Sequence, residues 1–424
     1  MAKKFEEIKE EEYPYELPEG WKWERLGKCV NLSANKTELF LDSTKYVGLE
    51  NIEKDTGIIK YEIGAELKSI KNVFVEGQIL YGKLRPYLNK HGIAKFKGVC
   101  STDILVFSAN NDVSNKWVDY YFNMPSFISY AISNSTGINL PRVNSKSILS
   151  YVIPIPPKET QQKIVDIIES LFAKLDIAQE KVEQVLAESE NRRSAILHNA
   201  FSGKLTEKWR KENNVSFDSW CIDKLKNFDI EIIDGDRGKN YPKKEEFSNK
   251  GECVFLNAKN VTKKGFSFSE VQFISKEKDD LLRKGKLVRG DIVLTTRGTI
   301  GNIALYDDVI PYNNMRINSG MVIYRCGDTL YKPFLINLYR SKYIIDQINE
   351  MQTGSAQPQL PIKIMNELEL CLPTLLEQKE IVRLLDKFLS VEDKVKSTCQ
   401  STLEAIATMR KSILAKAFRG ELVS

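Results

Sequence analysis

The chain has 424 residues, of which 42% are hydrophobic and 28% are charged, and its formal net charge at pH 7 is +5. This length and composition suit a folded protein of two or three domains and exclude a disordered chain. The sequence has no apolar run of 18 residues and no N-terminal signal segment, so we expect a cytoplasmic protein without a membrane span. The seven cysteines are scattered, which favours reduced thiols over disulfides or a zinc site.

The beginning of the chain predicts a leader followed by a mixed α/β domain. Residues 1–20 are strongly charged, and we expect them to form a mobile leader. Over residues 21–152, apolar runs such as YVGLENI, GQILYGKL and GVCSTDILVF are separated by Gly, Asn and Asp, which is typical of strands. The stretch WVDYYFNMPSFISYAISN has helical spacing that Pro125 interrupts. We therefore predict a first domain of mixed α/β class over residues 21–152.

Residues 153–205 predict one long helix with a narrow apolar seam. Pro156 and Pro157 precede it, where a missing N–H is tolerated, and Gly203 is placed to end it. Apolar residues recur in alternating steps of four and three, which is the pattern of a helix paired with another helix. The predicted seam residues are Ile164, Ile168, Leu171, Leu175, Val182 and Val185.

The rest of the chain repeats this organisation. Residues 206–369 form a second predicted domain, in which VFLNAKNV and RGDIVLTTRG correspond to YVGLENI and to the stretch around GQILYGKL. Residues 370–424 hold a second predicted helix, which matches the first over 53 positions in a constant register of 217. An internal repeat of this kind fixes the architecture. The second seam comprises Ile381, Leu385, Phe388, Val395 and Ile406, with Glu392 as an exception.

Matching seams in one chain predict that the two helices pair with each other. The first helix leaves domain 1 and the second helix starts at domain 2, so we expect an antiparallel coiled coil of roughly 60 Å with the domains at opposite ends. The two halves would then be related by an approximate two-fold axis. B-DNA has the same local symmetry, so such a molecule could address two half-sites about 34 Å apart.

The sequence offers no catalytic constellation. It contains two histidines, His91 and His198, which excludes paired metal-ligand spacing and makes a Ser/His/Asp triad improbable. The stretch GDRGKN (235–240) lacks the spacing of a phosphate loop, so we predict a turn there, and no G-x-G-x-x-G occurs. The sequence therefore argues against an independent enzyme and predicts no metal or cofactor in this chain.

Basic residues gather outside the predicted helices, which indicates a polyanionic partner; a solvated basic face without a partner is the alternative. Arg can contact guanine bidentately, Asn can contact adenine, and Lys suits phosphates. Candidates for DNA contacts follow predicted strands in both domains. They are Lys83, Arg85, Tyr87, Asn89, Lys90, Arg142 and Asn144 in the first domain, and Arg237, Lys239, Thr296, Arg297, Asn314 and Arg316 in the second.

Two repeated blocks, P-x(4)-Q-x-x-I-V and IL-x-x-AF-x-G-x-L, lie at 156–205 and 373–422. With GWKWERLG, ILYGKLRPYLNK, GKLTEKW and DIVLTTRG, they make the chain resemble the specificity subunit of a type I restriction–modification system over nearly its whole length. The resemblance implies two target recognition domains that each read half of a split double-stranded DNA sequence. It also implies helices that set the spacer and dock two methyltransferase (modification) subunits.

The resemblance further implies where the chemistry resides. The modification subunits would use S-adenosylmethionine to methylate adenine, and restriction subunits would add cleavage that depends on ATP and Mg²⁺. The recognition domains of this family vary widely, so the resemblance implies no base code for individual residues.

Two other interpretations remain open. The chain could be the recognition subunit of a fused, type IIB-like system that cleaves on both sides of its site, which the genomic neighbours would decide. It could instead be a coiled-coil scaffold whose domains hold proteins; DNA binding, unlike scaffolding, weakens steeply with added salt. A stand-alone methyltransferase is disfavoured because no cofactor loop is visible.

Overall fold

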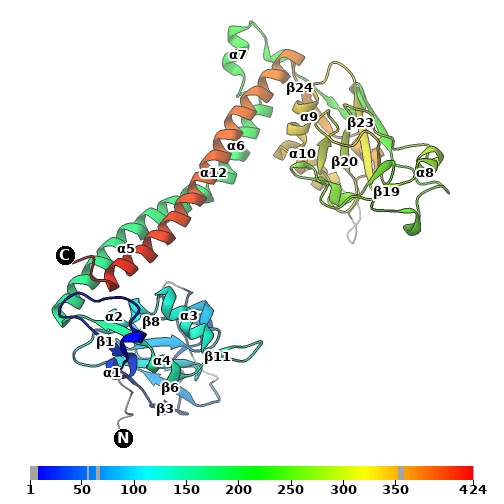
Figure 1. Ribbon diagram of the computed structural model, residues 1–424. Helices are drawn as coiled ribbons and strands as arrows, with labels where there is room; N and C mark the ends of the chain where they lie inside the picture. Colours follow the sequence, from blue (N-terminus) through cyan, green and yellow to red (C-terminus); the bar gives the residue numbers. More distant parts are fainter. Residues whose placement is uncertain (1–7, 55–56, 64–66, 352–357, 424) are drawn as a thin grey trace. The chain divides into compact units, whose positions relative to one another are not determined.

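The computed structural model describes residues 8–54, 57–63, 67–351 and 358–423. The chain divides into two compact units: unit 1 comprises residues 1–183 and 400–424, and unit 2 comprises residues 184–399. Each unit contains one globular domain and a stretch of each long helix (Figure 1). The predicted mixed α/β class is confirmed in both.

The domain of unit 1 is built on two sheets that share a buried core. One has the strand order β2-β10-β7-β8 and is antiparallel; the other has the order β3-β6-β9-β4-β5, with β4 and β9 parallel. Side chains of β7 alternate: Leu80 packs with the second sheet, whereas Ile79 and Tyr81 pack with helices α2 and α3. The elements of this domain are β2 (Val30–Leu32), β3 (Lys36–Thr37), β4 (Lys45–Val47), β5 (Glu62–Ile63), β6 (Lys71–Phe74), β7 (Ile79–Gly82), β8 (His91–Ile93), β9 (Gly98–Cys100), β10 (Ile104–Ala109), β11 (Ser135–Thr136), β12 (Arg142–Val143), α1 (Leu26–Cys29), α2 (Asn115–Tyr121), α3 (Pro125–Ser133) and α4 (Ser145–Ser150).

The domain of unit 2 has the same plan. Its sheet β15-β23-β20-β21 repeats the antiparallel order of unit 1, and β16 runs parallel to β22 as β4 does to β9. Val293 packs toward the second sheet, whereas Ile292 and Leu294 pack with helices α9 and α10. The elements are α7 (Glu207–Glu212), β15 (Ile230–Asp234), β16 (Cys253–Leu256), β17 (Val261–Thr262), β18 (Gly265–Phe266), β19 (Phe273–Ile274), α8 (Lys276–Leu281), β20 (Ile292–Thr295), β21 (Ile303–Leu305), β22 (Met315–Ile317), β23 (Met321–Cys326), α9 (Lys332–Tyr339), α10 (Lys342–Met351) and α11 (Ile362–Met365).

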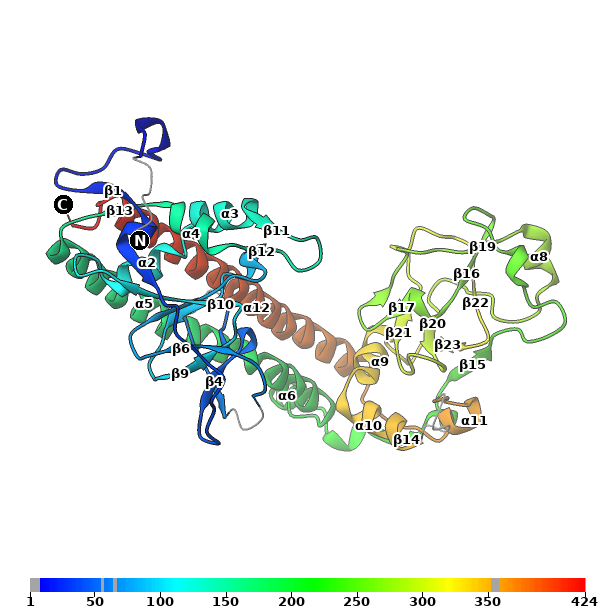
Figure 2. The ribbon, with the colours of Figure 1, turned by 90° about the horizontal axis from the view of Figure 1, so that it is seen from below.

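Each domain is closed by pairing of its first and last strands. In unit 1, β1 (Lys22–Arg25) pairs antiparallel with β13 (Val152–Ile155), and Figure 2 shows the two side by side. In unit 2, β14 (Cys221–Lys224) pairs in the same way with β24 (Glu369–Leu372). Residues 153–155 thus belong to a strand of the domain, three residues beyond the boundary that the sequence predicts.

The described part of the predicted leader packs against the rest of unit 1. Tyr15 donates its hydroxyl to the carbonyl of Phe418 at 2.9 Å, and the indole N–H of Trp23 donates to the carbonyl of Tyr15 at 3.3 Å. Tyr13 stacks on Trp23 with ring centroids 6.4 Å apart. Residues 1–7 of the predicted leader lie outside the described residues.

A buried glutamine fastens each long helix to its domain. Gln161 is fully buried; its Oε1 accepts from the N–H of Ser114 at 2.9 Å, and its Nε2 donates to the carbonyls of Asp112 and Pro156, each at 2.9 Å. In unit 2, Gln378 makes the same three bonds with Tyr331, Thr329 and Pro373, at 2.8, 3.3 and 2.9 Å. All partners are related by the 217-residue repeat, so both units set the direction of the helix in the same way.

The long helices run antiparallel within each unit. The first comprises α5 (Lys158–Ala187) and α6 (Ser189–Phe201), interrupted at Glu188, and the second is α12 (Leu375–Phe418). In unit 1, Ile168 shares a core with Phe418, and Asp176 forms an ion pair with Arg410. No helix in the described part of the chain is both long and apolar enough to cross a membrane.

In unit 2, Phe201 shares a core with Leu385, and Arg193 pairs with Asp393 at 2.7 Å. This ion pair and the one in unit 1 are related by the repeat, since Asp176 matches Asp393 and Arg193 matches Arg410. Exposed ion pairs contribute little to stability. They show, however, that the two long helices pair in the same antiparallel register in both units.

The observed seam differs in part from the predicted one. Val185 and Phe388 are 38% and 39% exposed, whereas Glu392 is buried, and its carboxylate accepts from Nε of Arg192 at 3.0 and 3.2 Å. Buried residues of α12 recur seven apart at 385, 392, 399 and 406, so Glu392 occupies a seam position. Of the predicted seam residues, Ile164, Ile168, Ile381, Leu385 and Ile406 are buried, and Leu171, Leu175, Val182 and Val395 are partly buried.

The hydrogen bonds of Gln161 predict that replacing it by a side chain of similar size without polar atoms strongly lowers the stability of the protein. Gln161→Leu leaves the Ser114 N–H and two carbonyls without their partner, so we expect it to lower the free energy of unfolding by about 1–3 kcal/mol. Urea denaturation of the full chain measures this. The matched control is Gln162→Leu at the exposed neighbouring position, which should change stability by no more than about 0.5 kcal/mol. Equal effects of the two substitutions would contradict the assignment.

Candidate nucleic-acid interface

In unit 1, the segment after β7 forms an exposed loop with a constrained backbone. Arg85 and Asn89 have φ values of 52° and 42°, which is uncommon for residues other than glycine. Between them lies the 3₁₀ turn Pro86–Leu88, and the N–H of Arg85 donates to the carbonyl of Pro141 at 2.7 Å. Arg85 is exposed and Tyr87 is 47% exposed, so the loop presents a guanidinium and a phenol ring at the surface.

A carboxylate at the foot of this loop holds two of the predicted cations. Asp103 lies 3.7 Å from Nζ of Lys83 and accepts from Nε and Nη2 of Arg142 at 3.2 Å each. The hydrogen bond with Asp103 raises the pKa of the Arg142 guanidinium. Asp103 was not identified from the sequence, and its role is to position Lys83 and Arg142 beside the loop.

The corresponding strand end in unit 2 carries Thr296 and Arg297. The N–H of Thr296 donates to the carbonyl of Gly320 at 2.8 Å, as the N–H of Lys83 does to that of Asp103 at 2.9 Å. Arg297 forms an isolated bridge with Gln359, as Leu84 does with Arg142. Arg297 is therefore the counterpart of Leu84, next to Arg85, and its side chain is exposed, whereas Thr296 is 6% exposed.

Three predicted contacts in unit 1 also form hydrogen bonds within the protein; Asn89 is buried, Lys90 is partly buried and Asn144 is exposed. Asn89 is 3% exposed and donates to Oδ1 of Asn123 at 3.0 Å, and Lys90 donates to the carbonyl of Leu49 at 2.6 Å. Asn144 caps helix α4, where its Oδ1 accepts from the Ser147 N–H at 2.8 Å. We assign Asn89, Lys90 and Asn144 to the framework of the loop.

In unit 2, Arg316 and Asn314 belong to a buried network around Asp279. Arg316 is 6% exposed, forms an ion pair with Asp279, and donates to the carbonyl of Lys284 at 2.8 Å. Asn314 donates to Oδ2 of Asp279 at 3.1 Å, and Lys286 pairs with the same carboxylate. The structure thus gives Arg316 and Asn314 a structural role. The sequence pattern could not reveal this role, because Asp279 lies on helix α8, whereas Arg316 lies on strand β22.

Burial alone would raise the pKa of Asp279. Hydrogen bonds from Lys286, Arg316 and Asn314 outweigh that effect and lower the pKa from 3.8 to about 2. Asp279 therefore stays ionised and holds these donors in place.

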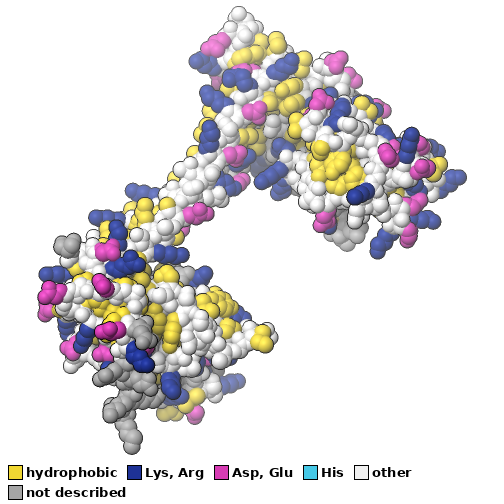
Figure 3. Space-filling model, viewed as in Figure 1, with side chains coloured by type: hydrophobic (Ala, Val, Ile, Leu, Met, Phe, Trp, Pro, Cys, Tyr) yellow, Lys and Arg dark blue, Asp and Glu magenta, His cyan; other side chains and the backbone are white. Residues whose placement is uncertain are grey.

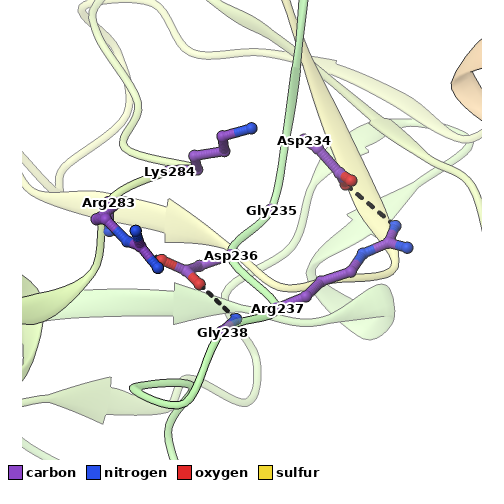
Figure 4. A pocket seen from close by; sticks show the side chains of 7 residues that line it. All are labelled: Asp234, Gly235, Asp236, Arg237, Gly238, Arg283 and Lys284. Carbon is purple, nitrogen blue, oxygen red and sulfur yellow. Dashed lines mark hydrogen bonds and ion pairs between the residues drawn. The ribbon is translucent and has the colours of Figure 1, made fainter.

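The last two predicted residues, Arg237 and Lys239, are exposed on the loop that follows β15. Nη2 of Arg237 donates to Oδ1 of Asp234 at 3.1 Å (Figure 4) and to the carbonyl of Ser319 at 3.3 Å. Two further exposed cations, Arg283 and Lys284, lie across a pocket from this loop. Arg283 and Lys284 are not among the predicted contacts; in the sequence they stand out only as part of the basic run LLRKGK at 281–286.

Comparison with known proteins places these observations in a family. The family described as type I restriction modification DNA specificity domain matches residues 18–187 and 225–405. The EcoDI type I restriction enzyme specificity subunit of Escherichia coli is 33% identical over 201 residues, which cover 46% of this chain and 45% of that subunit. The matches to the first curated relatives span 45% and 65% of their lengths.

Two solved structures share the fold. The HsdS subunit from Thermoanaerobacter tengcongensis is similar with a TM-score of 0.66 and 21% identity, covering 96% of this chain and 99% of that one. A chain from a study of complex assembly and conformational transition of the type I R-M system is similar with a TM-score of 0.76 and 20% identity, covering 96% and 100%.

The network around Asp279 predicts a specific acid sensitivity. Because the folded pKa of about 2 lies below the ordinary 3.8, the stabilisation is complete above pH 3.8 and is lost as the pH falls through 2. We expect Asp279→Asn to be less stable than the parent at neutral pH, with a shallower loss of Tm from about pH 5 to about pH 2. Calorimetry of the full chain measures this. Asp280→Asn, at the exposed neighbour, should follow the parent curve; identical curves for all three proteins would refute the role of Asp279.

Proposed function

The chain belongs to the family of type I restriction–modification DNA specificity domains, and from this premise we propose that it is a non-catalytic subunit that reads a bipartite DNA sequence. Unit 1 would contact one half of the target and unit 2 the other. The observation that carries the proposal is the duplicated unit, in which Arg85 and Arg297 are exposed at the same end of corresponding strands. An exposed guanidinium on a constrained loop suits a bidentate contact with guanine in the major groove.

Within this interface, we assign different tasks to different side chains. Arg85, Tyr87 and Arg142 are candidates for base contacts in unit 1, with Lys83 for a neighbouring phosphate. Arg297 is the candidate for base contacts in unit 2. Arg142 shares Asp103 with Lys83, so DNA would have to compete with that carboxylate, and we expect Arg142 to contribute less than Arg85.

We further propose that the long helices dock two modification subunits. Leu376, Val391 and Met409 on α12 are 71%, 51% and 53% exposed, and Figure 3 shows apolar side chains at the surface of the long helices in unit 2. A contiguous apolar patch is typical of a surface that binds another protein, whereas single exposed residues are common, so the membership in the specificity family supports the docking proposal more than these side chains do. Position 174, which matches Val391 in the repeat, is a lysine, so the two copies would meet non-identical surfaces.

The chemistry of the assembled complex would belong to the partners. We propose that modification subunits bind S-adenosylmethionine and methylate adenine, and that restriction subunits bind ATP and Mg²⁺. The present chain would select the DNA sequence on which they act, in the cytoplasm.

The half-site assignment can be tested by methylome sequencing of cells that express the full chain with its modification subunits. We expect Arg85→Ala to relax one half of the methylated motif and Arg297→Ala to relax the other, with a loss of discrimination of about 1–3 kcal/mol at one base pair in each case. Each variant serves as the control for the other.

Changes in both halves with either variant, or in neither half, would contradict the assignment of one half-site to each unit. The scaffold alternative makes a different prediction: it expects no steep fall in DNA affinity with added salt, whereas binding through phosphates requires one.

A further inference from the structure

Unit 2 contains a polar pocket that the proposed base contacts do not use. The pocket has a volume of about 330 Å³, with residues 234–238 on one side and Arg283 and Lys284 on the other (Figure 4). The first four residues of the stretch GDRGKN, which the sequence predicts to be a turn, line the pocket. One side lies at the end of β15 and the other follows α8, so the fold brings together segments that are distant in the sequence.

A buried carboxylate ties the two sides to each other. Asp236 is 8% exposed; its Oδ1 accepts from the N–H of Gly238 and its Oδ2 from the N–H of Arg283, each at 2.8 Å. The hydrogen bond from Gly238 is the main cause that lowers the pKa of Asp236, so the carboxylate remains charged. Because both oxygens are engaged by backbone donors, Asp236 acts as a structural link.

The backbone approaches closely on one side of the pocket. A β-carbon on Gly235 would lie 2.2 Å from the carbonyl oxygen of Asn318, so only glycine fits this position. On the opposite side, Nη2 of Arg283 lies 3.4 Å from the place of a β-carbon on Gly238, which puts the guanidinium over the loop. A close backbone approach and a guanidinium therefore border the pocket on its two sides.

The charge on the walls favours an anion. Arg237, Arg283 and Lys284 are exposed, and Arg237 is paired with Asp234. The charge of Arg283 also helps to lower the pKa of Asp236, so this carboxylate is a nearby counter-charge of Arg283. Asp234 is paired with Arg237, and Asp236 accepts from backbone N–H groups, so the three cations and two carboxylates that line the pocket leave an excess of one positive charge. Such a lining is suited to an oxyanion.

The position of the pocket identifies the class of anion. Ser319 accepts from Arg237, and the next residue, Gly320, accepts from the N–H of Thr296 at 2.8 Å. The same short turn thus borders both the pocket and the loop that carries Arg297. An anion in the pocket would lie beside whatever Arg297 contacts. In DNA, the groups next to the base edges are the backbone phosphates.

We propose that this pocket is a phosphodiester clamp, which holds the backbone of the DNA strand beside the bases contacted by Arg297. The inference rests on the proposed function of the chain. A free nucleotide is a poorer ligand, because the loop lacks phosphate-loop spacing and the Gly238 N–H already donates to Asp236. Arg283 and Lys284 would bind the phosphate oxygens by charge and would carry no base information.

The test uses the full chain in its methyltransferase complex, a labelled duplex with the methylated target, and a duplex of scrambled sequence. We expect Arg283→Ala/Lys284→Ala to weaken binding of both duplexes by the same factor. The slope of log K against log salt concentration should become shallower by about 0.9 per lost phosphate contact. The methylated motif should stay unchanged.

Two variants control for folding and for charge. Arg283→Lys keeps the positive charge and should keep the parental slope, and Lys342→Ala removes an exposed lysine paired with Asp346 on α10 and should also leave it unchanged. An unaltered slope in the double variant, or a changed motif, would overturn the clamp while leaving the proposed function intact. If the parent complex itself bound DNA without salt dependence, both the clamp and the proposed function would be contradicted.

Discussion

The arrangement of each unit depends on one buried side chain at the start of its long helix. Gln161 and Gln378 each satisfy a backbone N–H and two carbonyls that would otherwise be buried without partners, and they connect the helix to the loop before α2 or α9. A buried polar group is expensive unless every bond is made, so this geometry tolerates few alternatives. Because the same bonds occur in both units, the repeat includes the junction between helix and domain in addition to the fold of the domain.

Pairing of the long helices adds a second, less symmetric constraint. The exposed pair between Asp176 and Arg410 has its repeat in unit 2, but the pair between Arg192 and Glu392 has none, because Leu175 and Met409 occupy the matching positions. A charged pair inside a seam contributes little net stability, yet a charge left there without its partner is costly. The asymmetry therefore favours the pairing of the first helix with the second over the pairing of either with a copy of itself.

The sequence predicted what is periodic and repeated: the two domains, the long helices and their antiparallel pairing all follow from spacing that a single sequence displays. Closing strands β1 and β13 were not predicted, since neither is distinctive without its partner. Individual site residues were harder. An arginine such as Arg316 looks like a surface contact in the sequence, and only the distant Asp279 reveals that it is buried. Arg85 and Arg297 stayed exposed, but whether they contact bases remains a prediction.

We propose that the two copies of the unit each read a separate half of a DNA target. The most direct test of this proposal is the methylome of a cell that carries the chain with its modification subunits. We expect a single motif made of two specific parts separated by a stretch of arbitrary bases. A continuous motif, or methylation without any motif, would contradict it.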